Sequence, residues 1–304
     1  MTEIVLDDVT KIIRGKEVIS HVSLSMHSGR IYGFQGINGS GKTMLMRLIA
    51  GLVRPTSGSV RINEKVLWKD ISFPESVGIL LENPAFLGEY SAYQNLRLLA
   101  SVKKSISDES IKKVISCVGL EPESQKKYKK FSLGMKQRLA IALAVMHDPE
   151  LLILDEPING LDPIGIAEVR SFIRRLCDER GKTILLSSHI LSEIALLADD
   201  IGILDHGTLL EEESLAELES KSSRHIHFTL SDAAQAARIL EHKFHENHFT
   251  IQDDHNLQVD NLDISVAKLV TAFVTSGLEV SDAHTCEESL EDYFKRVTGG
   301  EGIA

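Results

Sequence analysis

The sequence predicts an α/β protein, with a parallel sheet core and helical crossovers, followed by a small α+β module. Three observations support this fold class. A glycine-rich stretch at 33–43 joins an apolar strand to an apolar helix. Between 151 and 212, short apolar runs alternate with helical patterns, as in a doubly wound parallel sheet. After residue 219, the predicted elements follow the order of a ferredoxin-like module with an appended helix.

The glycine-rich stretch is a candidate phosphate loop. It matches the pattern GxxxxGK[ST] between a strand and a helix, the context that this pattern needs. Glycines allow backbone N–H groups to surround a phosphate, and the helix N-terminus adds partial positive charge. We expect Lys42 to reach the β and γ phosphates of a nucleotide and the Thr43 hydroxyl to bind Mg²⁺. The alternative is a glycine-rich turn that matches by chance. The candidate phosphate-binding residues are Gly36, Asn38, Gly39, Ser40, Gly41, Lys42, Thr43 and Met44.

The run LLILDE at 151–156 is the second candidate motif. Four apolar residues predict a strand in the centre of the sheet, and two carboxylates follow at its end. We expect Asp155 to bind Mg²⁺ and Glu156 to polarise the attacking water as general base. An acidic pair that merely ends a strand is the alternative, and the phosphate loop upstream argues against it.

Flanking segments extend the core. Residues 3–9 and 18–26 alternate apolar and polar side chains and predict two strands joined by a turn at Gly15, which form an antiparallel edge. Residues 84–148 change to helical periodicity and predict a helical subdomain inserted into the core.

The chain is expected to divide into two domains, 1–219 and 220–304. The intervening segment SKSSR at 220–224 is polar, which is typical of a linker. Several histidines follow, among them His242, His245 and His248. A metal site is one interpretation, but no cysteine or acidic ligand set accompanies them, so we favour exposed side chains.

The composition is that of an ordinary globular protein, with 43% apolar and 25% charged residues in 304. A net charge of -11 argues against a nucleic-acid partner, because phosphate neutralisation needs a basic face. Three cysteines without metal-ligand spacing indicate reduced thiols. We see no secretory signal, and the apolar run at 139–146 is too short to span a bilayer, so any membrane role is expected through a partner.

A third motif, FSLGMKQRL at 131–139, places a serine and a glycine at the head of an apolar helix. The order of the phosphate loop, FSLGMKQR, LLILDEP, NGLD at 159–162 and SSH at 187–189 resembles the ATPase subunits of ABC transporters, over about residues 1–215. This resemblance implies a P-loop NTPase fold with a RecA-like parallel sheet core, an antiparallel β edge and a helical subdomain. It also implies ATP and Mg²⁺ as cofactors.

The resemblance further implies a dimer of ATPase domains that closes head to tail around two ATP molecules. Ser132 and Gly134 of one copy would contact the γ-phosphate held by the other copy. His189 would contact the γ-phosphate and stabilise the attacking geometry. Asp162 would lie in the loop that communicates between the two sites. Taken alone, His189 is more simply a structural histidine, and only its place after the other motifs favours the catalytic interpretation.

This chain departs from the family pattern at three places. The signature usually reads LSGGQ, whereas Leu133 and Met135 occupy its third and fifth positions here. After the strand VGILL, Glu82 stands where the family places a glutamine that contacts Mg²⁺ or water and relays contact with the permease. A carboxylate binds the metal more strongly but donates no hydrogen bond. We expect Glu82 to bind metal and couple turnover to the partner; a polar strand end is the alternative.

The third departure concerns the base of the nucleotide. The family commonly stacks an aromatic side chain on adenine near the first turn, where this chain has Ile13. Stacking on an aromatic ring contributes about 1–3 kcal/mol per base. Because Ile13 offers only apolar contact, we expect weak discrimination between ATP and GTP.

Three longer stretches, 82–100, 187–199 and 287–300, resemble the bacitracin and lantibiotic resistance branch of the family. That resemblance implies a separate membrane permease that exports an antimicrobial peptide, with this chain on the cytoplasmic face of a bacterial membrane as a homodimer or heterodimer. The alternative is a soluble ABC-type ATPase that acts on ribosomes or nucleic acid. Such proteins usually carry two ATPase domains or long coiled coils, and this sequence has neither.

Overall fold

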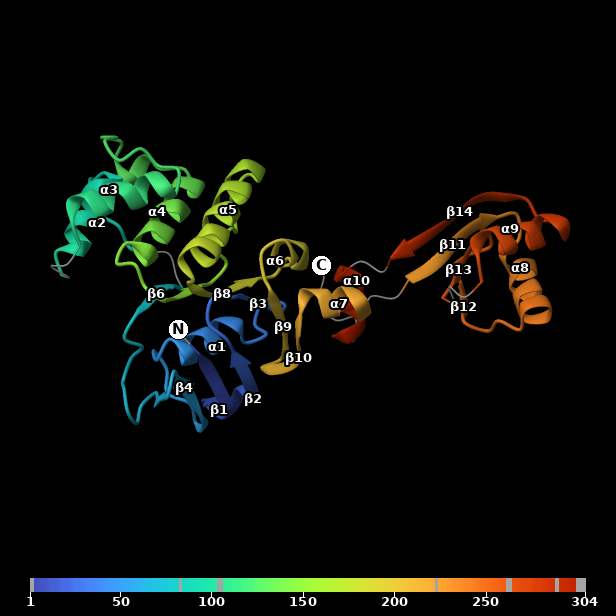
Figure 1. The fold of residues 1–304 in the computed structure, drawn as a ribbon, viewed down its shortest axis with the longest axis horizontal. Helices are drawn as coiled ribbons and strands as arrows, with labels where there is room; N and C mark the ends of the chain where they lie inside the picture. Colours follow the sequence, from blue (N-terminus) through green and yellow to red (C-terminus); the bar gives the residue numbers. More distant parts are fainter. Residues whose placement is uncertain are drawn as a thin grey trace. The chain divides into compact units, whose positions relative to one another are not determined.

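In the computed structural model, the chain forms two compact units that divide after Leu215 (Figure 1). The structure describes residues 3–81, 84–102, 106–221, 224–260, 264–287 and 290–298. The expected linker at 220–224 is shorter than the sequence indicated, because helix α7 (Leu215–Lys221) enters it and strand β11 (Arg224–Leu230) begins within it.

A six-stranded sheet forms the centre of the first unit. Its members are β3 (Ile31–Gln35), β6 (Val77–Leu80), β7 (Leu151–Leu154), β8 (Thr183–Ser188), β9 (Asp200–Asp205) and β10 (Thr208–Ser214). The order is β10-β9-β3-β8-β7-β6, and all neighbours are parallel except β10 and β9. Because β3, β8 and β7 are adjacent and parallel, the segments that follow them meet at one edge of the sheet.

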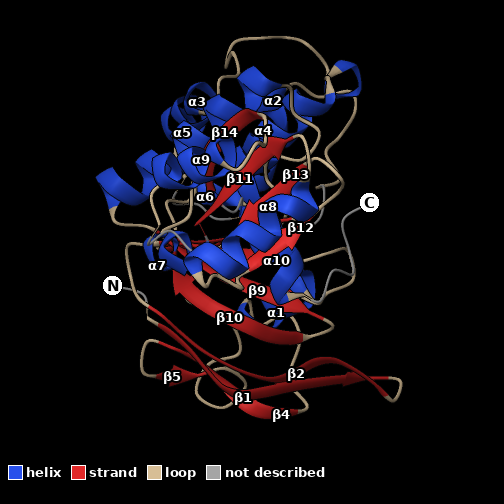
Figure 2. Ribbon diagram, turned by 90° about the vertical axis from the view of Figure 1, so that its right-hand side faces the viewer, coloured by secondary structure: helices blue, strands red, loops and turns tan. Residues whose placement is uncertain are grey.

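A separate antiparallel sheet lies on the core as a second layer (Figure 2). It contains β1 (Ile4–Ile13), β2 (Lys16–Met26), β4 (Ser57–Ile62) and β5 (Lys65–Val66), in the order β2-β1-β4-β5. Arg14 and Gly15 both adopt positive φ, 50° and 78°, and form the tight turn expected between the first two strands. Helix α1 (Lys42–Ile49) contributes Leu45 and Leu48 to one apolar cluster shared by both sheets.

The segment between β6 and β7 is helical, as predicted. It contains α2 (Ala92–Ala100), α3 (Asp108–Cys117), the short 3₁₀ turn η1 (Tyr128–Lys130) and α4 (Leu133–Val145), which lie together in Figure 1. Ser91 and Gln94 form a capping box that satisfies backbone donors at the start of α2. The two later crossovers are α5 (Pro163–Arg180) and α6 (Leu191–Ala195).

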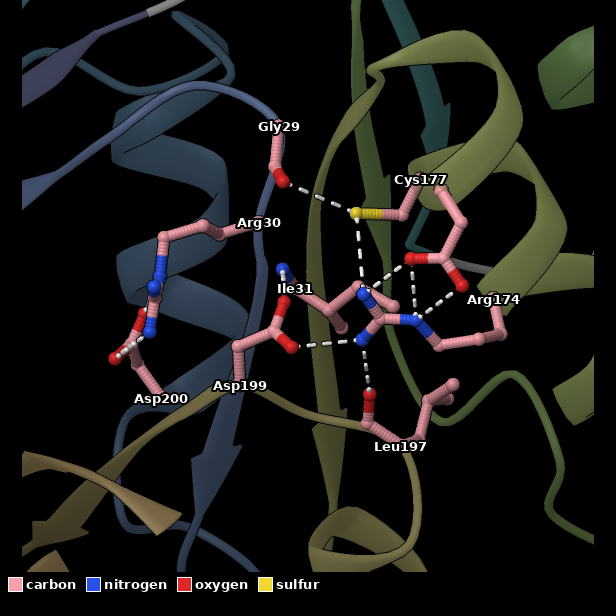
Figure 3. Close-up of polar contacts among 9 residues, drawn as sticks. Gly29, Arg30, Ile31, Arg174, Cys177, Leu197, Asp199 and Asp200 are labelled. Atoms are coloured by element: carbon pink, nitrogen blue, oxygen red, sulfur yellow. Dashed lines mark hydrogen bonds and ion pairs between the residues drawn. The ribbon is translucent and has the colours of Figure 1, made fainter. Parts of the chain in front are cut away.

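A charged network holds α5 to the amino-terminal ends of two central strands (Figure 3). Arg174 of α5 donates to Asp178 and, at 2.8 Å, to Asp199. Asp199 in turn accepts a hydrogen bond of 2.8 Å from the backbone of Ile31, the first residue of β3. The network therefore fixes the orientation of α5 at one end of the sheet. The segments that follow β3, β7 and β8 lie at the opposite end.

The second unit contains a four-stranded antiparallel sheet, with two helices that contribute to its core. Besides β11, its elements are α8 (Ala233–Ile239), the π-helical turn η2 (Leu240–Phe244), β12 (Phe249–Ile251), β13 (Asn256–Val259), α9 (Val266–Thr275), β14 (Val280–Glu287) and α10 (Leu290–Val297). The strand order β12-β13-β11-β14 is that of a ferredoxin-like module. Phe228 and Phe273 meet edge to face in its core. His242, His245 and His248 are exposed.

Candidate active site

The phosphate loop connects β3 to α1 in a conformation that requires glycine. A Cβ atom at Gly36 would collide with the Leu204 carbonyl oxygen and the Ser40 side chain. Gly41, the residue that precedes α1, has φ of +109°, which side chains rarely tolerate. The Ser40 hydroxyl is buried and has no hydrogen-bond partner within the part of the chain that the structure describes. A backbone cradle with an unused donor at a helix N-terminus fits a phosphate group.

Lys42 is directed into this loop and is only 6% exposed. Its Nζ atom donates to the carbonyl oxygens of Gly36, at 2.5 Å, and Ile37, at 3.0 Å. Burial lowers the pKa of the Lys42 ammonium, whereas the nearby charges of Glu156 and Asp155 raise it. Replacing two carbonyl partners by phosphate oxygens would give this buried cation stronger, charge-assisted hydrogen bonds.

A cavity of about 540 Å³ opens beside the loop. Its lining includes most of the predicted phosphate-binding residues: Asn38, Gly39, Gly41, Lys42, Thr43 and Met44. Val18, Arg47 and His206 also line the cavity, although they were not among the predicted site residues. Ile13 is 38% exposed at the end of β1 and is not among the lining residues.

Two oxygen atoms that could bind a metal ion, from Thr43 and Asp155, are in contact next to the loop. The Thr43 hydroxyl donates to Oδ2 of Asp155 at 2.6 Å, so residues 112 positions apart are brought together by the adjacency of β3, β8 and β7. In the described ranges, no group of three or more histidine, cysteine, aspartate or glutamate side chains could hold a metal ion. Mg²⁺ is typically held by one or two carboxylates together with substrate phosphates, and Thr43 with Asp155 fits that role. Glu82, the third predicted metal ligand, lies outside the described residues.

Ser187, which was not among the predicted site residues, contacts both Asp155 and the backbone of Glu156. Ser187 is fully buried near the end of β8; its hydroxyl donates to Asp155 and accepts from the backbone N–H of Glu156 at 3.0 Å. A serine at the carboxyl end of a buried strand, directly before the predicted histidine region, was the available signal. Ser187 therefore orients the proposed metal ligand and the proposed base together.

Glu156 and His189 form a close pair at the same edge. Oε2 of Glu156 lies 2.8 Å from Nδ1 of His189. Glu156, two residues beyond the end of β7, has φ of +50°, in the left-handed region that non-glycine residues rarely adopt. The backbone carbonyl of His189 accepts from the Gln35 side chain at 3.0 Å, which anchors the segment after β8 to β3.

The signature residues lie in a second cavity, of about 400 Å³. Ser132 caps α4 by accepting from the backbone of Met135, and Gly134, which lines the cavity, is in the first turn of that helix. Asp162, which lines the same cavity, caps α5 by accepting from the N–H of Gly165 at 2.8 Å. This cavity and the phosphate-loop cavity share no lining residue. Within one chain, the structure thus does not bring Ser132, Gly134 and Asp162 into the phosphate-loop cavity.

Two family descriptions match the sequence: "ABC transporter" over residues 19–159, and "AAA domain, putative AbiEii toxin, Type IV TA system" over residues 126–195. The chain is 42% identical to the bacitracin transport ATP-binding protein BcrA of Enterococcus faecalis over 299 residues, which cover 98% of this chain and 97% of that protein. It is 40% identical to the lantibiotic transport ATP-binding protein SrtF of Streptococcus pyogenes over 198 residues, 65% of this chain and 85% of that protein.

Among solved structures, the fold matches the dimeric structure of a post-hydrolysis state of the ATP-binding cassette MJ0796 bound to ADP and Pi. The TM-score is 0.63 at 23% sequence identity, and the match covers 70% of this chain and 98% of that one. This likeness confirms the predicted P-loop NTPase fold of the first unit.

Proposed function

We propose a peptide-export function for this chain. The chain belongs to the ATP-binding subunits of the ABC transporter family, and it is an ATPase. Its cargo is a bacitracin-like or lantibiotic-like antimicrobial peptide, and its partner is a separate membrane permease. The observation that carries the proposal is the similarity to BcrA along 98% of the chain, including the second unit, whereas the match to SrtF covers 65%. The longer match favours a bacitracin-like cargo over a lantibiotic.

The phosphate-loop geometry supports a division of labour in ATP hydrolysis. Lys42 and the loop amides bind the phosphates, and the unused Ser40 hydroxyl supplies a further donor. Thr43 and Asp155, together with the predicted ligand Glu82, would hold Mg²⁺, which would supply positive charge to neutralise the phosphates. Glu156 accepts the proton of the attacking water, and His189 orients the Glu156 carboxylate through their contact.

The separation of the two cavities supports a paired arrangement of ATPase subunits. Ser132 and Gly134 present a helix N-terminus at a cavity of their own, which a triphosphate held by another subunit would complete. Asp162 lies in that same cavity and would communicate with the neighbouring site. The pair consists of two copies of this chain or of this chain with a related subunit.

The permease must supply the route across the membrane. No helix in the described part of this chain is long and apolar enough to cross a bilayer. We place the chain at the cytoplasmic face of a bacterial membrane, where ATP is available and where closure of the ATPase pair drives the permease.

Expression of the chain together with a candidate permease subunit in a bacitracin-sensitive bacterium tests this function. We expect the minimal inhibitory concentration of bacitracin to rise, and a Glu156→Gln variant to abolish the rise. Parallel measurements with a lantibiotic decide between the two cargo classes. Unchanged sensitivity to both peptides, with normal expression of both subunits, would contradict the proposal.

A further inference from the structure

Gln137 connects helix α4 to the catalytic end of β7. It lies in the second turn of α4 and is 7% exposed. Its Nε2 atom donates to the backbone carbonyl of Glu156 at 3.2 Å and to that of Pro157 at 3.0 Å. The bond to Pro157 is buried and the bond to Glu156 is partly buried. Gln137 also lines a cavity of about 340 Å³, together with Asp155 and Glu156.

The backbone that Gln137 holds is strained. Glu156 adopts φ of +50°, in the left-handed region that non-glycine residues rarely occupy. Such conformations cost about 1–3 kcal/mol and persist only where the surroundings hold them in place. The amide nitrogen of Glu156 is held by Ser187 at 3.0 Å, and its carbonyl oxygen is held by Gln137. The two contacts fix the peptide groups on either side of the Glu156 Cα atom, and therefore the direction of its carboxylate.

We propose that Gln137 is a positioning residue for ATP hydrolysis: it keeps Glu156 in the left-handed conformation that directs its carboxylate to His189, and it links that carboxylate to helix α4. The inference rests on the proposed function in one respect, the role of Glu156 as base. The two Nε2 hydrogen bonds of Gln137 go to backbone carbonyls outside the phosphate loop, so removing them leaves that loop intact.

The contact between Gln137 and Glu156 also links Glu156 to Ser132, because Gln137 and Ser132 belong to the same helix. Ser132 caps α4 and Gln137 follows on the same helix, so the two residues move as one rigid element. A shift of α4 when Ser132 engages a triphosphate on a neighbouring subunit reaches the Glu156 carbonyl of its own chain through Gln137. Occupancy of one site thereby sets the geometry of the base in the other.

Gln137→Met tests the positioning role in the full chain, because methionine preserves the length of the side chain and removes its donor. We expect kcat for ATP hydrolysis to fall roughly 10- to 100-fold, the scale of a small misplacement of a catalytic group. We expect KM for ATP to stay within about 2-fold, because Lys42 and Thr43 are untouched. Gln125→Met, on an exposed loop, is the matched control and should leave both constants unchanged.

Gln137→Glu adds a readout that general loss of structure does not produce. A protonated carboxyl group can donate to a carbonyl, whereas an ionised one cannot. The ratio of the kcat of Gln137→Glu to that of the parent should therefore increase as pH falls. The same ratio for Gln137→Met should not change with pH. A parent-like kcat for Gln137→Met, or identical pH ratios for the two variants, would overturn the positioning role.

A double-mutant cycle tests the coupling through α4. If Ser132 acts on Glu156 through Gln137, the effects of Ser132→Ala and Gln137→Met on kcat should be less than additive. Fully additive effects would refute the coupling. These assays measure ATP hydrolysis without permease or peptide, so a chain that hydrolyses ATP as described but confers no resistance would refute the transport function and leave this inference standing.

Discussion

Glu156 and His189 are 33 residues apart in the chain, yet Oε2 of one lies 2.8 Å from Nδ1 of the other. The contact joins the segment after β7 to the segment after β8, and it exists because those strands are parallel neighbours in the sheet. A carboxylate that contacts an imidazole, in a cavity that Asp155 also lines, is suited to take a proton from water.

Replacing Glu156 by glutamine should stop turnover without weakening ATP binding. Glutamine keeps the shape of the side chain but accepts no proton, so we expect kcat to fall about 10²- to 10⁴-fold. Phosphate release measures the loss, and size-exclusion chromatography with ATP and Mg²⁺ should show a trapped dimer. A monomer under those conditions would contradict the paired arrangement.

Lys42→Met should remove ATP binding without lowering the thermal stability of the nucleotide-free protein. Burial of the Lys42 charge is unfavourable without a nucleotide, as the lowered pKa indicates, so we expect the nucleotide-free thermal midpoint to be no lower than that of the parent. ATP at about 100 times its Kd should stabilise the parent by about 2.7 kcal/mol and the variant hardly at all. Thermal melts with and without ATP make the measurement. Equal stabilisation of both proteins by ATP would exclude a phosphate-binding role for Lys42.

Ile13 should set the weak preference for the base. It is 38% exposed at the end of β1, which leaves room for a larger side chain. We expect the parent to hydrolyse ATP and GTP with similar kcat/KM, and Ile13→Tyr to strengthen ATP binding by about 1 kcal/mol or more through stacking. Ile12→Tyr is the matched control, because adjacent residues of a strand point to opposite faces. A strong preference of the parent for ATP would show that another residue recognises adenine.

Arg174→Lys should destabilise the first unit. Lysine cannot reproduce the fork of hydrogen bonds that Arg174 makes with Asp199 (Figure 3) and with Asp178. Asp199 is half-buried, so we expect loss of its contact to lower the free energy of unfolding by about 1 kcal/mol, whereas the exposed Asp178 contact adds little. Urea denaturation measures the change, and Arg175→Lys, at an exposed neighbouring position, should have little effect. Equal stability of the two variants would show that the network contributes nothing measurable.

The amino-acid sequence by itself determined the fold class and supplied the candidate site residues. The phosphate loop has its glycines at positions where the backbone requires them, and LLIL at 151–154 forms a strand buried at every residue. These features are local, because strand, turn and helix signals extend over a few neighbouring residues. Their order along the chain was enough to identify Lys42, Thr43, Asp155 and Glu156 as candidates.

Only the tertiary structure decided how those residues meet. The order of the strands, which depends on burial of surfaces far apart in sequence, places Ser187 between Asp155 and Glu156 and places Gln137 on the Glu156 carbonyl. Neither contact leaves a periodic signal, since each depends on register between separate elements. The same packing leaves Ser132 in a different cavity from Lys42, and no hydrogen bond in the described part of the chain joins them, which supports the second subunit in our proposal.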